Sequence, residues 1–136
     1  MSATVEPAVT TSTLRRRALG VAAAVLACVV LWTVGRAAGV DYTVESPGQP
    51  AMVIGLGPVI TISLASTLVG WAALAVLERV TRRGTLIWTV LAALVALLSL
   101  LPLAGVEAST GAKLALGAMH AAVAVVLIAL LPNRTR

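Results

Sequence analysis

Long apolar runs separated by short polar intervals dominate the pattern of this 136-residue chain. Each of the four runs is about 18 to 20 residues long and contains no acidic residue. A helix rises about 1.5 Å per residue, so a run of this length reaches across a hydrocarbon core of about 30 Å. We therefore predict an all-α fold, a bundle of four transmembrane helices at about residues 18–35, 58–77, 86–103 and 113–131.

The segment before the first run differs from the rest of the chain. Residues 1–14 are mainly Ser, Thr, Ala and Val and show no apolar periodicity, which predicts a disordered tail. The membrane domain then covers residues 15–136. Arginines followed by an apolar run also occur in signal peptides. This run continues as far as Trp32 and Val34, beyond a usual signal peptide, so we expect it to be retained as a span.

The polar intervals between the runs are short. The longest covers residues 36–51, and within it Val40, Tyr42 and Val44 alternate with polar neighbours, which is typical of an extended segment. Residues 78–84 form a basic turn, and residues 104–112 form a loop of small side chains. Trp88 lies near the start of the third run, where we expect it to anchor the helix at the membrane interface.

Basic residues gather on one side of this arrangement. The ends of the chain and the 78–84 turn carry eight of the ten: Arg15, Arg16, Arg17, Arg79, Arg82, Arg83, Arg134 and Arg136. Only Arg36 and Lys113 fall on the other side. Short cytoplasmic loops are enriched in Lys and Arg. We therefore expect a multi-pass protein of the cell membrane with both termini in the cytoplasm.

The composition narrows the class of protein. Hydrophobic residues make up 60% of the chain and charged residues 11%, whereas soluble domains are about a quarter charged. The net charge of +5 could attract nucleic acid, but the basic residues flank apolar runs and form no separate basic face. The lipid bilayer is therefore the expected partner, and nucleic acid is not.

Residues suited to catalysis or cofactor binding are scarce. Cys28 is the only cysteine, which excludes an internal disulfide and CxxC chemistry. All five acidic residues lie outside the apolar runs, so the single histidine has no acid there to complete a catalytic set or a metal site. We expect no enzyme activity, no cofactor and no metal.

His120 is the one strongly polar ionisable residue within a run, and such residues are costly in hydrocarbon and often functional. In one hypothesis, its neutral ring hydrogen bonds Ser63, Ser66, Thr67 or Ser99 of a neighbouring helix. In the other, Lys113, seven residues earlier on the same helix face, joins it in a ligand site. The candidate polar site is His120, Lys113, Ser63, Thr67 and Ser99.

Small residues recur at helical spacing in the second run, as Ser63, Thr67 and Gly70 and as Ser66, Gly70 and Ala73. Small side chains let membrane helices approach closely. This pattern favours a non-enzymatic interaction protein that self-associates or joins a larger membrane complex. The alternative is binding or transport of a lipid or small ligand around Lys113 and His120.

Several segments resemble an actinobacterial family of small four-span integral membrane proteins of unknown function. They are Arg15–Arg17, Ala38–Val44, Val53–Pro58, Gly70–Leu74, Leu77–Arg79, Lys113–Leu116 and Met119–His120. The resemblance covers nearly the whole chain after the tail. It implies the four-span architecture and adds no activity and no functional residue.

Overall fold

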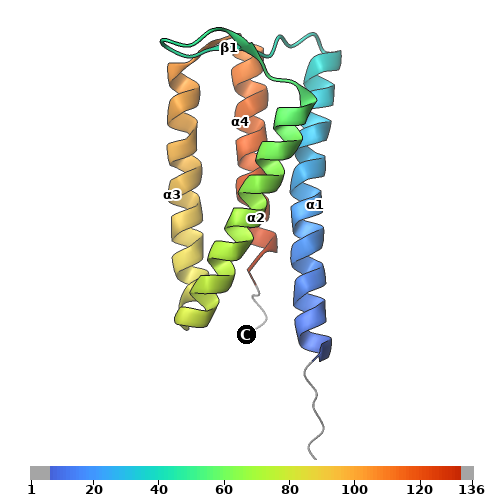
Figure 1. Cartoon of the computed structure of the whole chain (residues 1–136), viewed down its shortest axis with the longest axis vertical. Helices are drawn as coiled ribbons and strands as arrows, with labels where there is room; N and C mark the ends of the chain where they lie inside the picture. Colours follow the sequence, from blue (N-terminus) through green and yellow to red (C-terminus); the bar gives the residue numbers. More distant parts are fainter. Residues whose placement is uncertain (1–6, 133–136) are drawn as a thin grey trace, which may run out of the picture.

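Four helices account for most of the computed structural model, which describes residues 7–132 (Figure 1). They are α1 (Pro7–Ala37), α2 (Leu56–Val80), α3 (Gly84–Gly105) and α4 (Thr110–Val125). A π-helical turn, η1 (Val126–Leu130), continues α4, and three short strands complete the fold: β1 (Thr43–Glu45), β2 (Met52–Val53) and β3 (Glu107–Ala108). All four helical segments are long and apolar enough to cross a membrane. The predicted all-α, four-helix architecture is confirmed.

The helices begin earlier than the apolar runs suggested. α1 starts at Pro7, so residues 7–14 are helical where we expected a disordered tail, and residues 1–6 lie outside the described residues. Proline suits a first helical turn because its missing N–H would have no partner there. α4 starts at Thr110 because Ser109 caps it, its hydroxyl accepting a hydrogen bond from the Ala112 N–H at 3.1 Å.

The helices form a closed antiparallel ring. α1 packs against α2 and α4, and α3 packs against the same two helices from the opposite side. In Figure 1, α2 crosses the front of the bundle, from beside α1 at the sheet end to beside α3 at the other. The start of α1, the turn between α2 and α3, and the end of η1 share one end of the bundle. We call this the basic end; Arg134 and Arg136 lie outside the described residues.

A small sheet closes the opposite end, which we call the sheet end. β1 is its central strand and pairs antiparallel with both β2 and β3. Val44 faces Met52 on one side and Ala108 on the other. The extended segment indicated by the alternating residues is thus present, and the small-residue loop before α4 contributes a strand to it.

The core consists of one cluster of buried residues at each end. At the sheet end, Tyr42 belongs to a cluster of buried side chains from α1, α2 and α4 (Cys28, Val59, Ala112, Leu116 and Met119). At the basic end, Leu74, Trp88, Ala92 and Leu131 form the second cluster. Three of these side chains, Cys28, Ala92 and Ala112, are small, which lets the helices approach closely at those positions.

Candidate functional site

His120 is half-buried on α4 and bonds its own helix. Its Nδ1 lies 2.7 Å from the Leu116 carbonyl oxygen. A carbonyl oxygen can only accept, so Nδ1 carries the hydrogen and donates it. Lys113 is also half-buried, two turns nearer the sheet end on the same face of α4. The two residues proposed as a ligand site are therefore on one helix face.

The three hydroxyls proposed as their partners bond elsewhere. Ser63 donates to the Val59 carbonyl at 2.6 Å, Thr67 to the Ser63 carbonyl at 2.8 Å, and Ser99 to the Ala96 carbonyl at 2.7 Å. Each bond is with a carbonyl three or four residues earlier in the same helix, a common pattern for Ser and Thr. Within residues 7–132, none of the three hydrogen bonds His120.

The small residues of α2 divide between two faces. Ser63, Thr67 and Gly70 are buried in the bundle, whereas Ser66 and Ala73 are exposed on its outside. The spacing alone suggested a single patch. The structure instead separates a small-residue face that packs within the bundle from one that faces outward.

The outward face has small side chains around Val69, which is 69% exposed. Positions i−4, i−3, i+3 and i+4 surround a residue on a helix surface. Around Val69 these positions are all small and exposed: Ala65, Ser66, Ala72 and Ala73. We call these five residues the α2 patch.

The hydroxyl of Ser66 distinguishes the α2 patch from a purely apolar helix surface. The side chain is exposed near the middle of α2, a candidate membrane span. It forms no hydrogen bond within residues 7–132, in contrast to the hydroxyls of Ser63 and Thr67. A polar group without a partner is costly in hydrocarbon, and a second helix can supply one.

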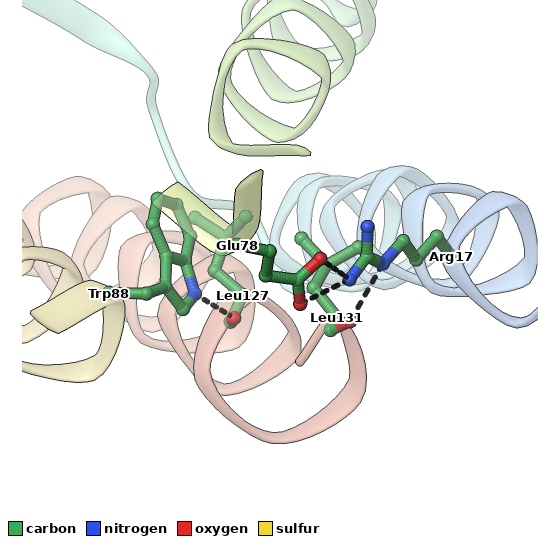
Figure 2. Close-up of polar contacts among 5 residues, drawn as sticks. All are labelled: Arg17, Glu78, Trp88, Leu127 and Leu131. Carbon is green, nitrogen blue, oxygen red and sulfur yellow. Dashed lines mark hydrogen bonds and ion pairs between the residues drawn. The ribbon is translucent and has the colours of Figure 1, made fainter. Parts of the chain in front are cut away.

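A set of polar contacts closes the basic end (Figure 2). One nitrogen of the Arg17 guanidinium, Nη2, lies 2.6 Å from both carboxylate oxygens of Glu78. Its Nε donates to the Leu131 carbonyl at 3.1 Å. The Arg17 side chain is only 7% exposed and that of Glu78 30%. These contacts link α1, α2 and the end of η1.

The indole of Trp88 adds α3 to this set. Its Nε1 donates to the Leu127 carbonyl at 2.8 Å. Among the described residues, that carbonyl has no backbone donor. The Leu131 N–H donates to the Val126 carbonyl instead, and the following residue, Pro132, has no N–H. Trp88 is 6% exposed, so it packs inside the bundle and does not anchor the helix at the interface as expected.

The sequence did not reveal the special position of Arg17. In the sequence it is one of three consecutive arginines that flank the first apolar run. A signal was nevertheless present, because Arg17 precedes the buried residues Gly20 and Ala24 by three and seven positions. That spacing places it on the buried face of α1.

Aromatic residues organise the sheet end. The rings of Trp32 and Tyr42 stack with centroids 5.9 Å apart. Trp32 Nε1 donates to the Ile54 carbonyl at 3.0 Å, and the Tyr42 hydroxyl donates to the Trp32 carbonyl at 3.3 Å. A Cβ at Gly35 would collide with this hydroxyl, so the close fit requires glycine. Burial raises the pKa of Tyr42 above its usual value.

Asp41 shapes the chain just before β1. Its carboxylate accepts hydrogen bonds from the Thr43 hydroxyl at 2.7 Å and the Thr43 N–H at 3.1 Å. Because these donors stabilise the charged form, the pKa of Asp41 falls below its usual value. Neither this turn nor the rest of residues 7–132 brings three His, Cys, Asp or Glu side chains together as a metal site.

Comparison with known proteins identifies one relationship. The model of a family of unknown function, DUF6069, matches residues 8–136. Neither the curated proteins nor the solved structures gave a match. Since the match covers nearly the whole chain, this protein belongs to the DUF6069 family of unknown function.

Proposed function

We propose that this protein is a non-enzymatic integral membrane protein of the cell membrane. It acts by association, with copies of itself or within a larger membrane complex. The α2 patch carries this proposal. Large side chains keep a second helix away, whereas four small residues around Val69 allow a close approach. A second chain at this face would also give the Ser66 hydroxyl a partner.

The hydrogen bonding inside the bundle favours association over the binding of a ligand between the helices. Its hydroxyls at Ser63, Thr67 and Ser99 bond carbonyls of their own helices. Among the described residues, no buried side-chain nitrogen or oxygen lacks a hydrogen-bond partner. A ligand entering the interior would have to displace these bonds, which costs free energy.

We further propose that both termini are cytoplasmic. At the basic end, Arg15 and Arg16 lie near the start of α1, and Arg82 and Arg83 lie in the turn between α2 and α3. At the sheet end, Arg36 lies in the last turn of α1 and Lys113 in the first turn of α4. This asymmetry supports a cytoplasmic basic end by the positive-inside rule. The sheet would then cover the outer face of the membrane.

The test is the mass of the protein extracted from its own membrane by an amphipathic polymer. A single chain has a mass of 13.8 kDa. We expect either multiples of this mass or a complex with a second kind of chain. The double variant Ala65→Leu/Ala72→Leu fills the α2 patch and should release the 13.8 kDa chain.

Ala118→Leu is the matched control, because it adds the same side chain at an exposed position on α4. It should leave the assembly intact. Two results would contradict the proposal. One is a wild-type protein that is a single chain in its own membrane, and the other is equal disruption by both variants.

A second candidate function is the binding or transport of a lipid or small anionic ligand. It is supported by the half-buried Lys113 and His120 on one face of α4. Lysine would hold an anionic group near the sheet end, with the imidazole deeper in the membrane. A retained molecule that is lost in His120→Ala would favour this candidate over association.

A further inference from the structure

The structure contains an open groove on the outside of the basic end, apart from the α2 patch and from Lys113. Its volume is about 460 Å³, within the range of small-ligand sites. It is lined by Ser12, Arg15, Arg16, Leu19, Gly20, Ala23 and Leu130. The residues from α1 recur at steps of three and four, so they form one continuous helix face.

The groove is polar at one end and apolar along the rest. Ser12, Arg15 and Arg16 lie nearest the start of α1, and Leu19, Gly20 and Ala23 follow toward the membrane centre. Ala23 is eight residues beyond Arg15, or about 12 Å along the helix. The headgroup region of a bilayer is about 6 Å thick on each side, so this distance extends from the headgroups into the hydrocarbon.

No acidic side chain among residues 7–132 neutralises the two arginines of the groove. The described residues contain one ion pair, and it uses Arg17 and Glu78. Arg15 is exposed and Arg16 half-buried, and neither pairs with an acidic side chain among the described residues. Two guanidinium groups and a serine hydroxyl that line one groove suit the oxygens of a phosphate, which accept charge-assisted hydrogen bonds.

The apolar part of the groove suits a hydrocarbon chain. Leu19 is 61% exposed and Leu130 41% exposed, and they contribute from α1 and η1. Gly20 lines the same groove, and a Cβ added there would be 3.7 Å from the Cβ of Leu130. Because Gly20 has no side chain, the space above it in the groove stays open.

We infer that this groove binds one anionic phospholipid, with its phosphate at Arg15, Arg16 and Ser12 and an acyl chain along Leu19, Ala23 and Leu130. A ligand that fits this groove must use both its polar end and its apolar floor. A free phosphate would not use the apolar floor, and a neutral lipid would not need two arginines that pair with no acidic side chain in the described part of the chain. Arginines between membrane helices are a known means of binding anionic headgroups.

The experiment is native mass spectrometry of the full chain, purified in detergent and titrated with dioleoylphosphatidylglycerol or dioleoylphosphatidylcholine. We expect one phosphatidylglycerol to bind in preference to phosphatidylcholine. Arg15→Gln/Arg16→Gln should weaken phosphatidylglycerol binding about tenfold or more. The matched control is Arg82→Gln/Arg83→Gln, which removes two exposed charges from the same end and should change binding less than about twofold.

A third variant tests the apolar floor without changing the charge. Ala23 is exposed on α1, so Ala23→Trp fills the groove and should also reduce phosphatidylglycerol binding. Equal losses in the two double-arginine variants would overturn the inference, because binding would then follow net charge. Unchanged binding in Ala23→Trp, or displacement of the lipid by equimolar inorganic phosphate, would also overturn it.

Discussion

Arg17 and Glu78 join the first two helices of the bundle through a guanidinium nitrogen that contacts both carboxylate oxygens at 2.6 Å. The same guanidinium holds the Leu131 carbonyl at the end of η1. Three segments far apart in the sequence therefore depend on one side chain (Figure 2). Because Arg17 is nearly buried, its charge would be costly without Glu78.

Glu78→Gln should therefore destabilise the bundle. Removing one partner of a buried ion pair costs about 3–5 kcal/mol, and the partial exposure of Glu78 reduces the expected loss to about 2 kcal/mol. Thermal unfolding in detergent measures this change. Arg79→Gln removes a neighbouring exposed charge and should have little effect. If the two variants unfold alike, the contact does not stabilise the basic end.

The double variant Arg17→Gln/Glu78→Gln should be less destabilised than the sum of the two single variants. In the double variant no charge is left buried, so part of the penalty disappears. Additive losses would show that the two side chains do not interact in the folded protein.

Gly84→Ala should disturb the turn between α2 and α3. An added Cβ would lie 2.9 Å from the Leu77 carbonyl oxygen and 3.0 Å from the Glu78 nitrogen, both backbone atoms. The backbone would have to shift, and we expect a loss of about 1–3 kcal/mol in unfolding free energy. Gly57→Ala is the control, since a Cβ there meets no atom within 4 Å. A Gly84→Ala protein as stable as Gly57→Ala would contradict this packing.

The sheet end should become less stable at low pH because of Asp41. Its folded-state pKa is lowered by the hydrogen bonds from Thr43, below an ordinary value of 3.8. The stabilisation is therefore complete above that ordinary value and is lost as the pH falls through the folded-state pKa. Hydrogen exchange of the Ile54 amide, which donates to the Tyr42 carbonyl, reports on this region.

Asp41→Asn provides the comparison for this pH dependence. Glu45 and Glu107 lie opposite each other in the sheet and remain in both proteins. Lowering the pH should therefore reduce the protection of the Ile54 amide from hydrogen exchange more in the wild type than in Asp41→Asn. Protection that increases as the wild type is acidified, or an identical pH response in both proteins, would contradict the assigned role of Asp41.

The spans could be predicted because each one is indicated by an apolar run of about 18 to 20 residues. The polar contacts depend instead on which face of a helix a single residue occupies. Ser63 and Ser66 are three positions apart in similar surroundings, yet Ser63 is buried and Ser66 faces outward. Arg16 and Arg17 are the same residue type, and only the spacing of Arg17 from the whole buried series Gly20, Ala24 and Cys28 places it on the buried face.

The end of α4 was also beyond prediction from periodicity. Its last turn is π-helical, and the Leu127 carbonyl is left for Trp88 because Pro132 lacks an N–H. This arrangement requires the helix, the proline and a tryptophan 39 positions away to meet. A single sequence contains each part and does not show that they come together.

The most direct test of the account is native mass spectrometry of the protein released from its own membrane, comparing the wild type with His120→Ala. We predict an assembly heavier than one 13.8 kDa chain, with the same composition and the same retained molecules in both proteins. That result would mean that the protein acts through association and that His120 serves the structure of α4. A single wild-type chain carrying a small molecule that His120→Ala fails to retain would contradict it.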